Sequence, residues 1–368
     1  MESMSNLAGL SNSIFASLGL ATASNPLGID QSAGQRECFV LVDGFGADAL
    51  MKYGDEFPIF AEMQSRNPLT SHFPSTTATN LSSFGTGVLP GVHGMLGYTV
   101  RVPRSGDPGR LLNSLKWDDR VDPIVWQSTP TLFERAVADG IHVGHVAAKR
   151  YEGSGFTQAA LRGASYMGAN HLPEMIAEAV RALSKPRSFA YVYINNLDAA
   201  GHDAGVGSEK WLEALKVVSD LLVGLRNALP AGSRIWMTSD HGMVNSENNI
   251  VMGVENNLME NITLIGGEPR ARHMYLREGA LDDTAALWRE TLGNRATVHT
   301  KSEAIATGLF GSTVSMDSED RMGDLIVIPH DDLILIDPER VKQESGMVGH
   351  HGGLTSIETQ VPLLTTSK

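Results

Sequence analysis

The chain has 368 residues, 42% of them hydrophobic and 19% charged, which is enough to bury the core of one large domain with an insertion, or of two domains. Its formal net charge of −13 argues against a protein that binds nucleic acid through a general basic surface. The single cysteine, Cys38, excludes an internal disulfide and a zinc site built from cysteines.

Residues 1–35 are expected to form a short helix, about Leu7–Leu18, followed by a connector that contains Gly, Pro and Ser. This segment has no Lys or Arg, whereas a secretory signal begins with a basic region. No stretch of the chain approaches the roughly 20 apolar residues of a membrane-spanning helix. We therefore expect a cytoplasmic protein that does not enter a membrane.

Several short apolar runs are typical of strands buried on both faces of a sheet. They lie at Cys38–Val42, Ile141–Ala147, Ser188–Ile194 and Arg234–Thr238. The clearest amphipathic pattern, at Lys210–Leu229, predicts a helix between the last two runs. Because strand, helix and strand follow one another with short connections, we expect a parallel sheet in an α/β fold. Further helices are expected at about Ala47–Met63 and Leu172–Leu183.

After residue 244 the predicted helices and strands become shorter and less regular. We expect residues 36–244 and 346–368 to form the core and residues 245–345 to be a cap inserted into it. Residues 98–128, which contain the loop PRSGDPG, are expected to form a hairpin or flap over the functional site.

The stretch Phe73–Gly94, FPSTTATNLSSFGTGVLPGVHG, crowds four hydroxyl residues immediately before Asn80. The segment Asn80–Gly87 suits a short helix that begins at a polar cap and ends at a glycine. A hydroxyl at a helix start lies where free N–H groups and the helix dipole favour an anion. The simpler interpretation is a polar turn that only caps the helix.

Acidic residues and histidines follow the predicted strands at metal-ligand spacings. Asp43, Asp198 and Asp240 follow three strands, His202 and His241 stand close to two of these aspartates, and the pair His350 and His351 supplies a further candidate. Carboxylate and imidazole suit Zn²⁺ and related ions, and the absence of thiolates favours a catalytic site over a structural one. Six such ligands divide into two metal sites with three protein ligands each.

Five motifs, in this order, make the chain similar to the alkaline phosphatase superfamily, and within it to the nucleotide pyrophosphatase/phosphodiesterase branch. They are VDGFG at 42–46, FPSTTATN at 73–80 with GTGVLPGVHG at 85–94, LDAAGHDAG at 197–205, SDHGM at 239–243 and GHHGG at 349–353. The resemblance spans residues 38–364 and implies a three-layer α/β/α sandwich, with a mostly parallel sheet and a small inserted cap. No motif covers residues 1–35 or the cap.

The resemblance also implies two zinc ions. One is held by Asp43, Asp240, His241 and the Thr77 hydroxyl, and the other by Asp198, His202 and His351. His351 is preferred to His350 because it directly precedes the Gly-Gly pair. Manganese or iron in one of the two sites is compatible with these ligands.

Thr77 is the implied nucleophile because it stands three residues before Asn80, which is expected to contact a phosphoryl oxygen. This chain has Ala78-Thr79 where the phosphodiesterases often have Phe-Pro, so the shape of the loop decides between Thr76 and Thr77. Metal coordination stabilises an alkoxide. The expected reaction is therefore attack of Thr77 on phosphorus, followed by hydrolysis of a phosphothreonine.

No Lys or Arg lies between Arg66 and Arg101, which favours a phosphodiester or pyrophosphate link over a more highly charged monoester. The sequence thus predicts a metal-dependent hydrolase of small phosphate esters, nucleotides among them. A phosphonate hydrolase, with Lys149 binding a substrate carboxylate, and a phosphomonoesterase are the alternatives within the superfamily. A non-catalytic protein that binds metal and phosphate is the alternative from another class.

Overall fold

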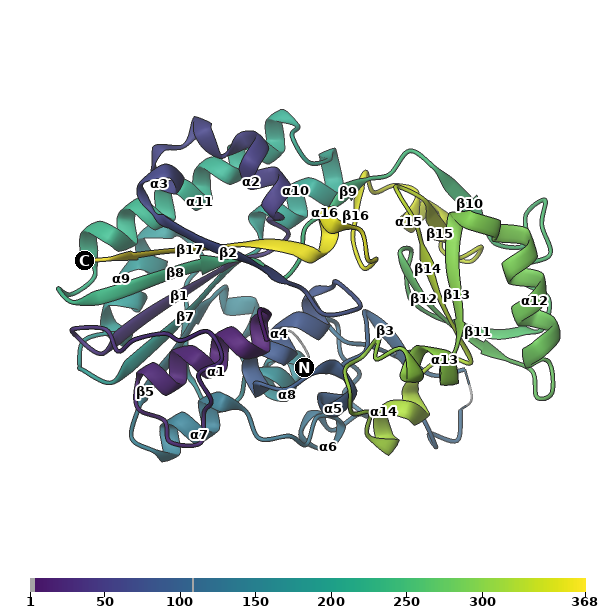
Figure 1. Ribbon diagram of the computed structural model, residues 1–368, viewed down its shortest axis with the longest axis horizontal. Helices are drawn as coiled ribbons and strands as arrows, with labels where there is room; N and C mark the ends of the chain where they lie inside the picture. The colour runs from purple at the N-terminus through teal and green to yellow at the C-terminus, as the bar shows by residue number, and fades with distance from the viewer. Residues whose placement is uncertain (1–3, 108) are drawn as a thin grey trace.

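The computed structural model describes residues 4–107 and 109–368. Its centre is a seven-stranded sheet with the strand order β2-β17-β8-β1-β7-β5-β6 (Figure 1). The strands are β1 (Arg36–Val42), β2 (Gln64–Thr70), β5 (His142–Ala147), β6 (Ser165–Gly168), β7 (Ser188–Ile194), β8 (Ser233–Thr238) and β17 (Gln360–Ser367). The five strands from β8 to β6 are parallel, while β17 is antiparallel to both β8 and β2. The predicted α/β fold with a mostly parallel sheet is confirmed.

The central strand β1 shows why helices cover both faces of the sheet. Phe39 and Leu41 belong to one hydrophobic core, whereas Cys38, Val40 and Val42 belong to a second core. Successive side chains point to opposite faces, so a strand that is apolar at every position needs cover on each side.

The first core is covered mainly by α1 (Leu7–Ser17), α4 (Thr77–Thr86), α7 (Leu132–Ala138) and α8 (Gly155–Ala160). The second is covered by α2 (Ala47–Tyr53), α3 (Pro58–Glu62), α9 (Leu172–Ala182), α10 (Asn196–Ala204) and α11 (Glu209–Ala228). Figure 1 shows the two helical layers on either side of the sheet.

Three local expectations differ from the structure. The helix predicted over residues 47–63 is divided into α2, the 3-10 turn η1 (Gly54–Glu56) and α3, which begins at Pro58, a residue that favours the first turn of a new helix. The helix predicted to begin at Asn80 begins at Thr77. The edge strand β2 was not predicted because it is exposed except at Leu69 and lacks a buried pattern.

Residues 245–345 build a smaller unit beside the carboxyl ends of the parallel strands (Figure 1). Its four-stranded antiparallel sheet has the order β11-β12-β14-β13, from β11 (Ile262–Glu268), β12 (Ala271–Leu276), β13 (Ala296–Thr300) and β14 (Leu325–Pro329). The helix α12 (Leu281–Leu292) inserts Trp288 into a third core that is separate from the other two. We propose that these residues form the inserted cap that the sequence predicts.

Short elements complete the chain. The predicted flap contains the antiparallel pair β3 (Thr99–Arg101) and β4 (Leu111–Asn113). Two more pairs join β10 (Asn249–Val251) to β15 (Ile334–Ile336) and β9 (Val244–Asn245) to β16 (Gly349–His350). The remaining helices and turns are α5 (Pro90–His93), α6 (Pro123–Trp126), η2 (Lys149–Tyr151), η3 (Gly293–Arg295), α13 (Lys301–Ala306), α14 (Met316–Arg321), α15 (Val341–Glu344) and α16 (Ser356–Thr359).

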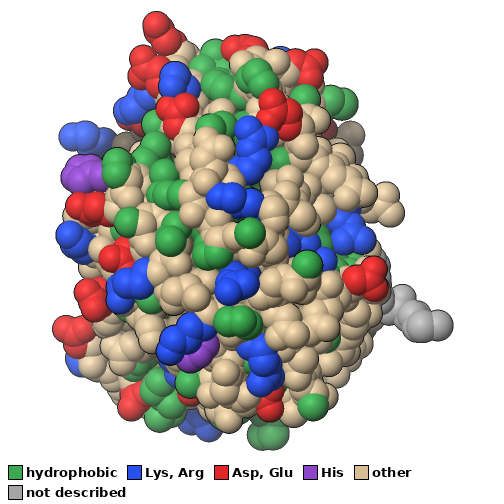
Figure 2. All heavy atoms as spheres, turned by 90° about the vertical axis from the view of Figure 1, so that its left-hand side faces the viewer, with side chains coloured by type: hydrophobic (Ala, Val, Ile, Leu, Met, Phe, Trp, Pro, Cys, Tyr) green, Lys and Arg blue, Asp and Glu red, His purple; other side chains and the backbone are tan. Residues whose placement is uncertain are grey.

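The surface at the end of the core remote from the cap is of mixed character. Figure 2 shows Lys and Arg side chains scattered there among neutral and apolar groups, with Asp and Glu between and around them. Among the helices of the described residues, none combines the length and the apolar character that a membrane crossing needs.

Candidate active site

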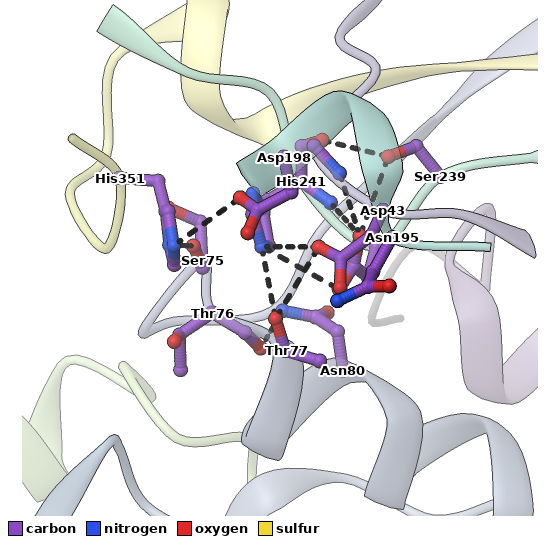
Figure 3. Close-up of polar contacts among 12 residues, drawn as sticks. Asp43, Ser75, Thr76, Thr77, Asn80, Asn195, Asp198, Ser239, His241 and His351 are labelled. Carbon is purple, nitrogen blue, oxygen red and sulfur yellow. Dashed lines mark hydrogen bonds and ion pairs between the residues drawn. The ribbon is translucent and has the colours of Figure 1, made fainter. Parts of the chain in front are cut away.

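The loop of residues 73–76, called the nucleophile loop after the role predicted for Thr77, leads to a threonine at the positive end of the ten-residue helix α4. Thr76 is the N-cap of α4, but its hydroxyl donates to Oε2 of Glu268 at 2.9 Å and makes no capping bond. The first N–H groups of α4 therefore lack a side-chain cap and can bind an anion. Thr77 is the first residue of the helix, and its Oγ1 lies 3.2 Å from Nε2 of His241 and 3.4 Å from Oδ1 of Asp43 (Figure 3). Of the two candidate nucleophiles, Thr77 has its hydroxyl beside Asp43 and His241, whereas the hydroxyl of Thr76 is bonded to Glu268.

An inner cluster of Asp43, Asp240 and His241 lies at the carboxyl ends of the neighbouring strands β1 and β8. Nε2 of His241 is 3.3 Å from Oδ1 of Asp43 and 3.4 Å from Oδ2 of Asp240. The side chains of all three residues are at most 3% exposed. The backbone amide of Gly44, in the left-handed region at φ 76°, donates to Oδ1 of Asp240 at 3.2 Å and so links the two strand ends.

An outer cluster is formed by Asp198, His202 and His351. The sequence indicated that Asp198 follows a strand end, but the structure places it in the first turn of α10, so Asp198 and His202 share one helix face. Oδ1 of Asp198 lies 3.4 Å from Nε2 of His202 and 3.9 Å from Nε2 of His351. These side chains are 11–27% exposed, so the outer cluster is more accessible than the inner one.

All three histidines are oriented alike. Nδ1 of His241, His202 and His351 lies 2.8–3.0 Å from a backbone carbonyl, that of Gly242, Gly349 and Ser75 respectively. An Nδ1–H donated to a carbonyl leaves the lone pair on Nε2, which in each ring faces the carboxylates. This is the arrangement found for metal-ligating histidines.

Buried carboxylate oxygens without a hydrogen-bond donor also point to metal binding. Oδ1 of Asp198 and Oδ2 of Asp240 are buried without a hydrogen-bond donor among residues 4–107 and 109–368. A buried acceptor without a donor is costly unless a cation supplies the missing charge. The rings of His241 and His351 stack with centroids 3.7 Å apart, so the two clusters adjoin. The six residues therefore fit two neighbouring divalent metal ions.

Burial and mutual repulsion shift the pKa values of the cluster residues. Burial, reinforced by the charge of Asp43, raises the pKa of Asp240, and burial is also the main cause that raises the pKa of Asp198. Burial by itself lowers the pKa of His241, but the charges of Asp240, Asp43 and Asp198 outweigh it and raise that pKa. Burial and the charge of His241 lower the pKa of His351 well below its usual range. The site thus concentrates carboxylates that need a cation.

Two cavities meet at Thr77. The larger, about 280 Å³, also reaches the outer cluster and the cap, and it is lined by Thr76, Thr77, Tyr98, Leu115, Asp198, His202, Gly267, Glu268, Pro269, Arg340, Gln343, Glu344, Met347, His350 and His351. The smaller, about 120 Å³, is lined by Asp43, Thr77, Leu81, Leu115, His145, Tyr151, Ser154, Phe156, Thr157, Leu161, Tyr193, Asn195 and Asp198. Charged residues and histidines are more numerous in the lining of the larger cavity, whereas aromatic and aliphatic side chains are more numerous in that of the smaller one.

Asn80 and Lys149, which the sequence suggested as substrate-binding residues, contact other parts of the chain. The amide nitrogen of Asn80 is 3.2–3.3 Å from the carbonyls of His72, Pro74 and Thr76, and its oxygen accepts from the amide of His72. Lys149 is 58% exposed and lies 3.9 Å from Glu174. Neither residue lines either cavity, so their proposed contacts with substrate stay predictions.

Two contacts of the site were not foreseen from the sequence. The Tyr193 hydroxyl donates to Oδ2 of Asp43 and fixes the orientation of that carboxylate. Glu268 reaches the nucleophile loop from the cap strand β11. Tyr193 is the next-to-last residue of a predicted strand, where it could have been noticed, but the sequence around Glu268 carries no motif.

Two adjoining carboxylate-histidine clusters at the edge of a parallel sheet, with a threonine at a helix start, suit metal-assisted hydrolysis at phosphorus. The family model for type I phosphodiesterase/nucleotide pyrophosphatase matches residues 38–354, and the chain belongs to this family. The resemblance expected from the motifs is thereby confirmed. No curated protein gives a significant match to the sequence.

Solved structures agree on the fold. An inactive threonine-to-alanine variant of murine ectonucleotide pyrophosphatase/phosphodiesterase 5, in complex with AMP, superimposes with a TM-score of 0.72 at 16% identity, over 90% of this chain and 87% of that chain. The human protein of the same name gives 0.70 at 17% identity, over 90% and 87%. Phosphonoacetate hydrolase from Sinorhizobium meliloti, in complex with phosphonoformate, gives 0.68 at 18% identity, over 90% of both chains.

Proposed function

We propose that the protein hydrolyses phosphodiester or pyrophosphate bonds in two steps, through a phosphothreonine on Thr77. The observation that carries the proposal is the place of the Thr77 hydroxyl, at the uncapped start of α4 and within 3.4 Å of both His241 and Asp43. Two zinc ions, one held by the inner cluster with Thr77 and one by the outer cluster, belong to the proposal, and manganese or iron suits one of these sites.

When bound, the metal ions stabilise a threonine alkoxide and the charge on the phosphoryl oxygens. Thr77 forms the bond to phosphorus, and the leaving oxygen departs with its electron pair. The first N–H groups of α4 donate to the non-bridging oxygens, and Asn80 holds the loop in place through its backbone contacts. Water then attacks the phosphothreonine and restores the hydroxyl of Thr77.

The cavities favour a substrate with two different ends. Tyr151, Phe156 and Tyr193 give the smaller cavity flat aromatic walls, which suit a ring such as a nucleobase. The similarity to a protein crystallised with AMP supports a nucleotide as one part of the substrate. The larger cavity, with Arg340 in its wall, then receives the polar remainder.

A phosphonate hydrolase is the second candidate, because phosphonoacetate hydrolase shares the fold. That reaction needs a cation for the substrate carboxylate. Arg340 lines the larger cavity and takes over this role from Lys149, which lies outside it. Release of phosphate from phosphonoacetate, and its loss in the variant Arg340→Gln, is the outcome that would establish this activity.

The test of the main proposal is hydrolysis of bis-p-nitrophenyl phosphate and p-nitrophenyl phosphate by the zinc-loaded protein. We expect the diester to be preferred and Thr77→Ala to lower kcat by at least about 10⁴-fold while zinc stays bound. Thr77→Ser is the matched control, since it keeps the hydroxyl and should retain measurable turnover. Unchanged turnover in Thr77→Ala would contradict the proposal.

A further inference from the structure

Glu268 is a buried carboxylate that reaches the reaction centre from the cap. It is the last residue of β11 and is 6% exposed. Its Oε2 accepts the hydroxyl of Thr76 at 2.9 Å, while its Oε1 has no hydrogen-bond donor within the described part of the chain. Glu268 lines the larger cavity together with Thr76 and Thr77, so its side chain lies beside the space where a phosphoryl group must lie.

Two glycines lie against this side chain. A Cβ at Gly352 would lie 2.9 Å from Cγ and 3.3 Å from Oε1 of Glu268, and Gly352 has a φ of 122°. A Cβ at Gly97, directly before the flap, would lie at an ordinary contact distance of 3.8 Å from Oε1. Glu268 is therefore inserted between the flap and the segment that carries His351, and any larger residue at Gly352 would displace it.

No basic side chain of the described residues forms an ion pair with Glu268. The nearby Arg272 is paired with Glu344, and Arg270 is paired with Glu358. Arg340, in the wall of the same cavity, lies 3.6 Å from Asp337. In keeping with this lack of a partner, burial raises the pKa of Glu268 to about 7. When it is ionised, its negative charge lies beside the larger cavity, which its side chain lines.

We propose that Glu268 determines specificity by excluding phosphoryl groups with two negative charges. The proposal rests on the phosphoryl transfer at Thr77 proposed above. The phosphate group of a monoester carries two negative charges near neutral pH, whereas that of a diester carries one. Since like charges repel strongly in a partly buried site, a fixed carboxylate beside Thr76 penalises the monoester more than the diester. Glu268 thereby selects diesters and the internal phosphates of pyrophosphate links.

The experiment compares Glu268→Gln with Glu278→Gln, an exposed residue of the same cap that undergoes the same change of charge. Values of kcat/KM for the two p-nitrophenyl esters are measured at about pH 8.5, where the monoester is a dianion. We expect Glu268→Gln to raise the monoester-to-diester ratio about tenfold, and Glu278→Gln to leave it unchanged. An equal change for both esters in Glu268→Gln would overturn the proposal.

Binding gives a second readout that needs no turnover. In the Thr77→Ala background, calorimetry with p-nitrophenyl phosphate should show about tenfold tighter binding when Glu268 is replaced by Gln, with little change for the diester. Identical dissociation constants with and without the replacement would overturn the proposal. Glu268→Ala replaces Glu268→Gln if the latter does not fold. Failure of the wild-type protein to hydrolyse either ester would refute the proposed function, whereas the binding comparison would still decide the role of Glu268.

Discussion

The inner and outer clusters use the same residue types but are built differently. The inner cluster joins the ends of two adjacent parallel strands, and its side chains are almost fully buried. The outer cluster joins one face of α10 to a segment that follows the cap, and its side chains are partly exposed. The difference indicates that the sheet fixes the geometry of the inner site, whereas the outer site depends on contacts between separate parts of the chain.

Among the changes that test the difference between the two clusters, replacing Asp240 by Asn should have the largest effect on metal content and activity. The amide oxygen of Asn can still accept from Gly44 and His241, but the anionic Oδ2 is lost. We expect metal content to fall from two ions to one per chain and kcat/KM to fall at least about 1000-fold. Elemental analysis of the purified variant and diester kinetics check this. Retention of both ions would show that Asp240 is not a ligand.

Replacing His202 by Ala should have a smaller effect, because the outer cluster is more open to solvent and water can occupy the vacated position. We expect a loss of about 100-fold in kcat/KM, with the inner metal retained. A chelator should likewise remove the outer ion of the wild-type protein first, in two resolved phases of metal release. Simultaneous loss of both ions would mean that the clusters bind as one unit.

The smallest expected effect is a dependence on pH of the free energy of unfolding of the metal-free protein. The pKa values of Asp240 and His241 are raised to about 8 and about 10, and that of Glu268 is raised to about 7, so between about pH 7.5 and 9 the folded state holds protons that the unfolded state has lost. Histidines whose pKa is lowered by burial, such as His145, act only below this range. The free energy of unfolding should thus fall as pH rises, by about 1.4 kcal/mol per pH unit for each extra proton.

Thermal unfolding of the metal-free and zinc-loaded proteins at several pH values checks this. Zinc should remove most of the pH dependence, because it replaces the protons between the carboxylates. Metal-free protein that becomes more stable between about pH 7.5 and 9 would contradict the assignment.

The inner cluster was predictable because its residues follow apolar runs directly. Asp43 comes one residue after β1 and Asp240 two residues after β8, so the strand pattern alone places them at one edge of the sheet. The motif resemblance added Thr77 and His351, which lie far from these strands in the sequence.

The contribution of the cap could not be predicted in the same way. Glu268 follows two glycines and precedes a proline, which predicts a turn and gives no sign of a buried carboxylate. Its position depends on how β11 packs beside the flap, a tertiary contact without local pattern. For Asn80 the reverse holds, since the motif predicted its place three residues after Thr77 but not its bonds to the backbone of the loop before α4.

The bridge between Ser75 and Gly352 has a consequence for the order in which the site is assembled. The Ser75 hydroxyl donates to the carbonyl of Gly353, and Nδ1 of His351 lies 3.0 Å from the carbonyl of Ser75. During synthesis, the ribosome therefore completes the nucleophile helix and the entire cap before His351 emerges. The outer cluster is complete only when residues 349–353 dock against the nucleophile loop.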